Sequence, residues 1–295
     1  MSFVKTNFEG YEAYELLTPS LRLVAVTQFG PRIAFFGPRE GRNLLWWAPE
    51  KASRKGWYSR GGHRIWVARP MADEAEETYA PDNAPCEATP EEDCLTLWGG
   101  PHEGSMTRRG MRIRLLDERT VTVTGLLKNE GDMLYSGGLW GVTCTLTENR
   151  VYGVPLGSRG LPFDLVRLII PRSWAGHKTR VTDPQYILNE EFLKLIPSGE
   201  ESKRMLLTPC GAVAMACPDA GVTFVKSAPY QEGLPYPQGA NIALYTAPER
   251  LFCEMELMNP ERMLQPGQIL EGEERWQLLP QVCAFESDRE LALFR

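Results

Sequence analysis

Two carboxylates near the end of this 295-residue chain are the side chains best spaced for acid–base chemistry. They are Glu254 and Glu256, within the segment 251–260, Leu-Phe-Cys-Glu-Met-Glu-Leu-Met-Asn-Pro. Because strand side chains alternate between faces, both would share one face of a strand, about 7 Å apart at ~3.3 Å per residue. Flanking apolar side chains raise the pKa of a carboxyl towards that of a useful general base. The alternative is an amphipathic strand with a solvated acidic face.

A second polar cluster occurs at 61–66, Gly-Gly-His-Arg-Ile-Trp. Its glycines allow a close approach of the backbone, and His63 and Arg64 follow them at the edge of an apolar segment that contains Trp66. A guanidinium suits a sugar hydroxyl or a carboxylate, and an indole suits the apolar face of a pyranose. The alternative is a turn with a surface arginine and a core tryptophan.

Further candidate side chains occur singly. Asp82 and Asn83 belong to a turn, where they either hydrogen-bond ligand hydroxyls or cap a neighbouring element. Lys226 ends an apolar strand and either lies at a sheet edge or points its charge into a cleft. His177 and His102 lie in loops, with a surface position as the alternative for each. Because the chain has 3 histidines, any histidine-dependent proton transfer must use one of them.

Charge and composition exclude several classes of function. The net charge of −6 argues against non-specific binding to nucleic acid or anionic membranes, which needs a basic patch. The sequence contains no zinc-binding spacing, no glycine-rich nucleotide loop and no serine nucleophile elbow, so we expect neither a metal nor a cofactor. The 7 cysteines are scattered without a Cys-x-x-Cys pair, and no leader or transmembrane run is present. We therefore expect reduced thiols in a cytoplasmic protein.

The elements that would position these residues are mainly strands. The 27 glycines and 23 prolines punctuate many short apolar runs, a pattern typical of a large antiparallel β architecture. We expect hairpins at 111–124 and 212–225, and a helical pattern only at 185–195 and 288–294. A long irregular excursion covers 72–90, a length that is often functional. No linker interrupts the sequence, so we predict one domain spanning 1–295.

The motifs, in their order along nearly the whole chain, resemble the aldose 1-epimerase (galactose mutarotase-like) superfamily, and most closely its branch related to hexose epimerases. The resemblance implies an all-β fold, a large antiparallel β-sandwich, with a sugar site on the concave face of one sheet. The matching segments are 27–33 (Thr-Gln-Phe-Gly-Pro-Arg-Ile), 41–45 (Gly-Arg-Asn-Leu-Leu), 62–65 (Gly-His-Arg-Ile), 127–132 (Leu-Lys-Asn-Glu-Gly-Asp), and Glu256 followed by Pro260 and 264–267 (Leu-Gln-Pro-Gly).

The resemblance implies Arg64 as a sugar-binding arginine and Glu256 as the catalytic base, although Glu254 could be the counterpart instead. One departure is important. After the turn at 127–132 the family presents a histidine as general acid, and the run 136–143 has none; Trp140 or Thr143 stands in that neighbourhood. The acid would then be His63 or His177, or else Lys226.

Two readings of function follow. In the first, the protein is an enzyme that acts on the anomeric centre of a small-molecule sugar, with Glu256 as base, His63 or His177 as acid, and Trp140 as a stacking platform. In the second, the protein binds carbohydrate on the same scaffold without turnover, because the acid histidine is missing. A lyase or hydrolase that uses Glu254 with Glu256 fits less well, since glycosidases flank the scissile bond from two sides.

Overall fold

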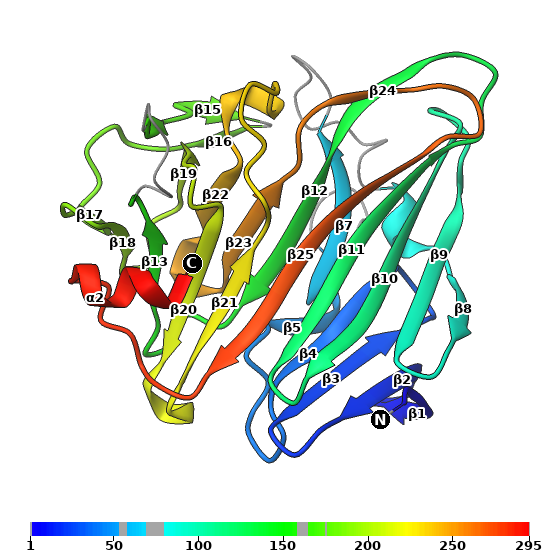
Figure 1. Cartoon of the computed structure of the whole chain (residues 1–295), viewed down its shortest axis with the longest axis horizontal. Helices are drawn as coiled ribbons and strands as arrows, with labels where there is room; N and C mark the ends of the chain where they lie inside the picture. Colours follow the sequence, from blue (N-terminus) through cyan, green and yellow to red (C-terminus); the bar gives the residue numbers. More distant parts are fainter. Residues whose placement is uncertain (1, 53–57, 69–79, 158–164, 175, 295) are drawn as a thin grey trace.

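The described residues form mainly β-strands, arranged in two large antiparallel sheets that lie face to face (Figure 1). The computed structural model describes residues 2–52, 58–68, 80–157, 165–174 and 176–294. The predicted all-β antiparallel sandwich is confirmed. Within the described part of the chain, no helix has the length and apolar character needed to cross a bilayer.

The first sheet has eleven strands and contains most of the residues singled out above. Its order is β1 (Val4–Phe8), β2 (Tyr11–Leu17), β3 (Leu21–Val26), β4 (Arg32–Pro38), β7 (His63–Ala68), β12 (Tyr135–Thr145), β23 (Cys253–Met258), β22 (Ile242–Thr246), β19 (Ser202–Leu207) and β14 (Arg167–Ile169), with β24 (Arg262–Leu264) pairing with β12.

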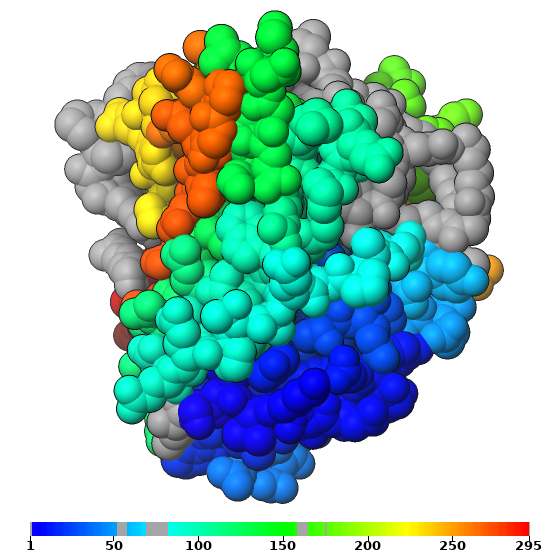
Figure 2. Space-filling view, turned by 90° about the vertical axis from the view of Figure 1, so that its right-hand side faces the viewer, coloured from blue at the N-terminus to red at the C-terminus, as the bar shows by residue number. Residues whose placement is uncertain are grey.

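The second sheet has ten strands. Its order is β17 (Tyr186–Leu188), β18 (Phe192–Leu195), β13 (Val151–Pro155), β20 (Ala212–Cys217), β21 (Val222–Ser227), β25 (Ile269–Leu279), β11 (Thr120–Asn129), β10 (Thr107–Asp117), β9 (Cys94–His102) and β8 (Glu87–Pro90). Seen from the side, the N-terminal strands (blue) lie next to β8 and β9 (cyan), and the tips of β12 and β24 lie together at the opposite end (Figure 2).

Short elements complete the chain. They are the ribbons β5 (Trp47–Ala52) with β6 (Tyr58–Gly61) and β15 (Ser173–Trp174) with β16 (His177–Lys178), the 3-10 turns η1 (Ala80–Asn83), η2 (Pro218–Ala220), η3 (Pro237–Gly239), η4 (Pro248–Arg250) and η5 (Ala292–Phe294), and the helix α2 (Asp288–Leu291).

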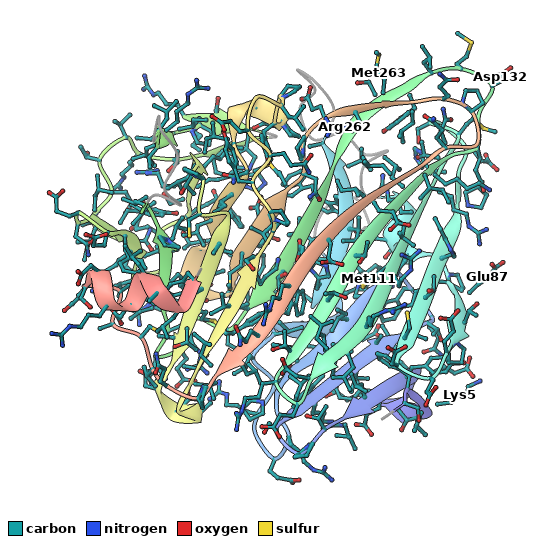
Figure 3. The ribbon with its side chains drawn as sticks, in the orientation of Figure 1. Lys5, Glu87, Met111, Asp132, Arg262 and Met263 are labelled. Atoms are coloured by element: carbon teal, nitrogen blue, oxygen red, sulfur yellow. The ribbon has the colours of Figure 1, made fainter. Side chains whose placement is uncertain are left out.

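The main core lies between the two sheets and draws apolar side chains from both, from Phe3 to Leu278. Met111, labelled in Figure 3, is one of its fully buried members, whereas the labelled Lys5 and Met263 stand at the exposed margins. Six of the seven cysteines are buried, and all seven are free. A smaller apolar cluster, which includes Phe294, packs the C-terminal helical segment on the outer face of the second sheet.

Most predicted elements are found in the structure. The hairpins at 111–124 and 212–225 are β10–β11 and β20–β21, and 288–294 is helical. The helical pattern at 185–195 was wrong, because that segment forms β17 and β18, whose apolar residues pack at the edge of the second sheet. The excursion contains η1 and β8 in its second half, while 72–77 lies outside the described residues.

Paired glycines position the strand that carries Arg64. Gly61 and Gly62 have φ values of +75° and +65°, in the left-handed region that suits glycine. A Cβ on Gly62 would lie 2.2 Å from the Ile33 carbonyl oxygen, and one on Gly61 would lie 2.0 Å from the Trp46 carbonyl oxygen. The close approach expected from the sequence is therefore present, and it fixes the start of β7 against β4.

Backbone strain alone at a residue with positive φ costs about 1–3 kcal/mol. Replacing Gly62 with alanine is expected to lower the free energy of unfolding by more than this, because the new Cβ would also clash with the Ile33 carbonyl oxygen. Gly233→Ala is the matched control, because Gly233 also has a positive φ of +77° but nothing within 4 Å of its added Cβ. Urea denaturation of both variants measures the difference. Equal losses for the two variants would contradict the close-approach explanation.

Candidate functional site

The acidic strand β23 lies in the middle of the first sheet with its two glutamates on the outer face. Cys253, Met255 and Leu257 belong to the main core, so the predicted alternation of the strand is confirmed. The solvated alternative does not hold, because Glu256 is 0% exposed and Glu254 is 9% exposed. Both carboxylates are therefore held among protein groups.

Glu256 is held by one indole and one ammonium group. Trp140 Nε1 donates a 2.8 Å hydrogen bond to Oε2 of Glu256. Lys203 Nζ lies 3.2 Å from each of the two carboxylate oxygens. Trp140 is on the neighbouring strand β12, and Lys203 is on β19, two strands away on the other side. Side chains from three strands, β12, β23 and β19, thus build this site across the outer face, with β22 lying between β23 and β19.

A small cavity lies beside the two donors to Glu256, although Glu256 itself is not among its lining residues. Its volume is about 30 Å³, which admits a water-sized group. Both donors to Glu256, Trp140 and Lys203, line it, and Trp174 from the ribbon β15 forms another wall. The remaining lining residues are Ala68, Pro171, Met205, Gln238 and Met258. The Lys203 ammonium lies 5.0 Å from the Trp140 ring centroid and 5.8 Å from that of Trp174.

Arg64 belongs to a second polar network on the same face. Its Nη2 donates a 3.0 Å hydrogen bond to Glu254 Oε1, and its Nε lies 3.9 Å from Asp82 Oδ2. Asp82 also accepts a 2.7 Å hydrogen bond from Trp66 Nε1. The Trp66 and Trp140 rings meet edge to face at 5.4 Å, so the two networks adjoin. Arg64, Asp82 and Glu254 are thus brought together, with Arg64 paired to both carboxylates.

Burial affects the ionisation of this second network. Arg32, from β4, lies 3.6 Å from Asp82 and is fully buried. Desolvation lowers its pKa to about 10, although the charge of Asp82 opposes the shift. Burial likewise raises the pKa of the Cys144 thiol to about 12, with the nearby Glu254 charge acting in the same direction. Cys144 is therefore a neutral thiol in this network at neutral pH.

His63 and Thr143 point from the inner face of the first sheet, and Lys226 points from β21 of the second sheet, into the space between the sheets. The register explains the positions of His63 and Thr143, because His63 pairs with Thr143 and Thr143 with Met255, whereas Arg64 pairs with Val142 and Val142 with Glu256. Adjacent strand residues point to opposite faces. The structure therefore does not bring these three residues to the face that carries Glu256.

These interior residues form their own hydrogen-bonded chain. Lys226 Nζ donates to Thr143 Oγ1 at 2.7 Å and lies 3.2 Å from Glu274 Oε2. His63 Nδ1 lies 2.8 Å from the same Thr143 oxygen. Trp276 Nε1 completes the chain with a 2.8 Å hydrogen bond to Glu274. Desolvation lowers the pKa of Lys226 even though Glu274 opposes the shift. The buried Lys226–Glu274 pair joins β21 to β25 within the second sheet, and the hydrogen bond from Lys226 to Thr143 reaches the first sheet.

The His63 imidazole gives the protein a testable pH dependence. Burial, and then the positive charge of Lys226, hold the pKa of His63 well below its ordinary value of 6.5. Below pH 6.5 the unfolded chain therefore binds a proton that the folded chain does not, so stability falls as the pH falls. We expect the free energy of unfolding of the wild type to fall with decreasing pH more steeply than that of His63→Gln, by up to about 1.4 kcal/mol per pH unit. Urea denaturation between pH 7 and 5 measures this loss, and equal pH slopes would contradict it.

His177 and Asn83 stand at the periphery. His177 Nδ1 lies 2.7 Å from Glu201 Oε1, and its ring stacks on Trp174 with centroids 5.4 Å apart. It therefore supports the indole that lines the cavity, one layer away from the cavity itself. Asn83 is exposed and accepts a hydrogen bond of 3.3 Å from Arg60 Nε. The described residues include no group of three His, Cys, Asp or Glu side chains placed to hold a metal ion.

Comparison with solved structures decides the fold. A candidate aldose 1-epimerase from Escherichia coli K12 superposes with a TM-score of 0.61 at 14% identity, covering 90% of this chain and 98% of that protein. A galactose mutarotase-like protein from Lactobacillus casei gives a TM-score of 0.62 at 10% identity, covering 90% and 99%. The chain has the galactose mutarotase-like fold. No protein-family profile and no curated protein sequence matches it.

The galactose mutarotase-like fold also occurs as part of a longer protein. A TPR-domain containing protein from Parabacteroides distasonis gives a TM-score of 0.62 at 16% identity, and the match covers 93% of this chain but 48% of that protein. The superfamily resemblance noted from the motifs is thus confirmed at the level of fold.

Two residues of the site were missed in the sequence. Lys203 stands in a buried strand, 202–207, with no motif around it, and only the strand order places it beside Glu256. Trp174, three residues before His177, was given no role from the sequence. A possible signal was the alternation of that strand, which puts Lys203 and Met205 on one face, but nothing in the sequence pairs this strand with β22.

Proposed function

We propose that the outer face of the first sheet binds an aldose and that Glu256 is the general base in interconverting its anomers. The observation that carries the proposal is the cavity beside the two donors to Glu256, since Trp140 and Lys203 both line it. The neighbours named as an aldose 1-epimerase and a galactose mutarotase-like protein support a sugar as the substrate class.

The chemistry requires one base and one acid. The base takes the proton of the anomeric hydroxyl while the acid gives a proton to the ring oxygen, and the ring opens, rotates and recloses. Glu256 takes the first role. Trp140 and Trp174 offer indole faces to the apolar side of a pyranose. We propose that Arg64, Asp82 and Glu254 position the neighbouring indoles of Trp66 and Trp140.

Sugar entry requires a rearrangement at the cavity. Its volume of about 30 Å³ admits a water-sized group, which is smaller than a pyranose. Trp174 and Pro171, which form one wall, belong to the segment around the ribbon β15–β16, whereas Trp140 and Met258 are on central strands of the sheet. We therefore propose that the wall carrying Trp174 moves outward when a sugar binds, while the central strands remain in place.

Carbohydrate binding without turnover is the second candidate. One specific observation favours it, namely that every histidine has a partner away from Glu256. His63 is bonded to Thr143, His102 to Ser105, and His177 to Glu201. If none of them supplies the proton, the site would retain a sugar but would not equilibrate its anomers.

The two candidates are separated by a rate and an affinity. Freshly dissolved single anomers of a panel of free and phosphorylated aldoses would be followed by polarimetry with and without the protein, and binding measured by calorimetry. Anomer interconversion faster than in buffer supports the enzyme. Binding without acceleration supports the second candidate. If no saccharide in the panel binds, both are contradicted.

A further inference from the structure

We propose that Lys203 is the general acid of this site, in place of the histidine that the sequence lacks at 136–143. The inference rests on the proposed function, because it assigns the second proton of the same reaction. The inference depends on the position of the Lys203 ammonium group on β19. Neither the fold nor the sequence motif around Glu256 specifies that position.

The first argument is proximity. Lys203 Nζ lies 3.2 Å from both oxygens of Glu256, and it lines the cavity between Trp140 and Trp174. In an aldose ring, the anomeric hydroxyl oxygen and the ring oxygen are attached to the same carbon. The base and the acid must therefore lie side by side, as the Glu256 carboxylate and the Lys203 ammonium do.

The second argument is capacity. An ammonium group has three donors and no acceptor, so Lys203 can keep a hydrogen bond to Glu256 while directing another donor at a ring oxygen. Arg64, the other cation on this face, is bonded to Glu254, and an arginine does not release its proton in proteins.

The third argument is the position of the other side chains that could donate a proton. His63 and Lys226 lie between the sheets, on the opposite face from Glu256. His177 is paired with Glu201 behind Trp174. Lys203 is the remaining protonated side chain that both contacts Glu256 and lines the cavity in the described part of the chain.

The proton balance closes without a co-reactant. Glu256 takes the proton of the anomeric hydroxyl, and Lys203 gives a proton to the ring oxygen as the bond from the anomeric carbon to that oxygen breaks. The anomeric carbon becomes a carbonyl carbon, Glu256 is a neutral acid, and Lys203 is a neutral amine. After rotation about the adjacent carbon–carbon bond, ring closure returns one proton to Lys203 and the other to the new anomeric hydroxyl.

The test compares Lys203→Gln, Lys203→Met and Lys203→Arg with the wild type on whichever aldose the wild type interconverts. Glutamine keeps a hydrogen-bond donor for Glu256 but has no proton to transfer, so it serves if the methionine variant does not fold. Lys194→Met is the matched control. Lys194 is also a strand lysine paired with a glutamate, at 2.8 Å from Glu286, but it is on β18 of the second sheet, away from Glu256.

We expect kcat to fall by about 10²–10⁴-fold in Lys203→Gln and Lys203→Met, with sugar affinity largely kept, and to stay unchanged in Lys194→Met. Lys203→Arg keeps a positive charge beside Glu256 but does not release a proton, so we expect it to lose rate as Lys203→Gln does. A rate within threefold of wild type in Lys203→Gln or in Lys203→Arg would overturn the role of Lys203 alone. No acceleration by the wild type would overturn the proposed function as well.

Discussion

Glu256→Gln is expected to slow anomer interconversion by about 10²–10⁴-fold while leaving sugar affinity close to that of the wild type. Glutamine has nearly the same shape as glutamate, and its amide oxygen can still accept the hydrogen bond from Trp140 Nε1, which is 2.8 Å long in the wild type. It cannot take a proton at neutral pH. Stopped-flow polarimetry or one-dimensional NMR of a freshly dissolved anomer measures the rate, and calorimetry measures the affinity.

Glu254→Gln is the matched control for this prediction. Glu254 is on the same strand and the same face, but its carboxylate is bonded to Arg64 and does not share the donors of Glu256. We expect its rate to stay within about tenfold of wild type, well short of the loss of a general base. A larger loss in Glu254→Gln than in Glu256→Gln would exchange the roles of the two glutamates. Equal rates in the wild type, Glu254→Gln and Glu256→Gln would show that neither glutamate of this strand is the general base.

Lys226→Met is expected to lower the free energy of unfolding by about 3–5 kcal/mol, because it leaves Glu274 as an uncompensated buried charge. Glu274 is 3% exposed and lies 3.2 Å from Lys226 Nζ. Glu274 also packs directly against Gly141, where a Cβ would lie 1.9 Å from Glu274 Oε1. Urea denaturation at pH 7 measures the loss.

The double variant Lys226→Met with Glu274→Gln is the control. Glutamine removes the charge but can still accept the hydrogen bond from Trp276 Nε1, so most of the lost stability should return. If the double variant were as unstable as the single one, the loss would come from packing and not from an unpaired charge. A single-variant loss below about 1 kcal/mol would show that Lys226 does not compensate the buried charge of Glu274.

Local pattern predicted the strands well, because alternation is a property of the chain itself. Met255 and Glu256 are on opposite faces of β23 for that reason. The same rule applied to 61–66 would have separated His63 from Arg64, since neighbouring strand residues cannot share a face. The helical pattern at 185–195 was wrong because edge packing against the second sheet outweighed local propensity.

The partners of Glu256 could not be predicted, because they depend on strand order. Lys203 is 53 residues away from Glu256 along the chain and reaches it only because β22 lies between β19 and β23. Trp174 depends on where the ribbon β15–β16 packs over that face. One domain over 1–295 stays our proposal, supported by a main core that draws on both sheets. A cytoplasmic location stays a prediction from the cysteines.

A crystal structure of Glu256→Gln soaked with the aldose that the wild type interconverts tests the sugar site most directly. We expect the anomeric hydroxyl within about 3 Å of the Gln side chain at position 256, the ring between Trp140 and Trp174, and the ring oxygen facing Lys203. A sugar found elsewhere on the protein, with Lys203 still against position 256 and Trp174 unmoved, would contradict the assignment of this face as the site.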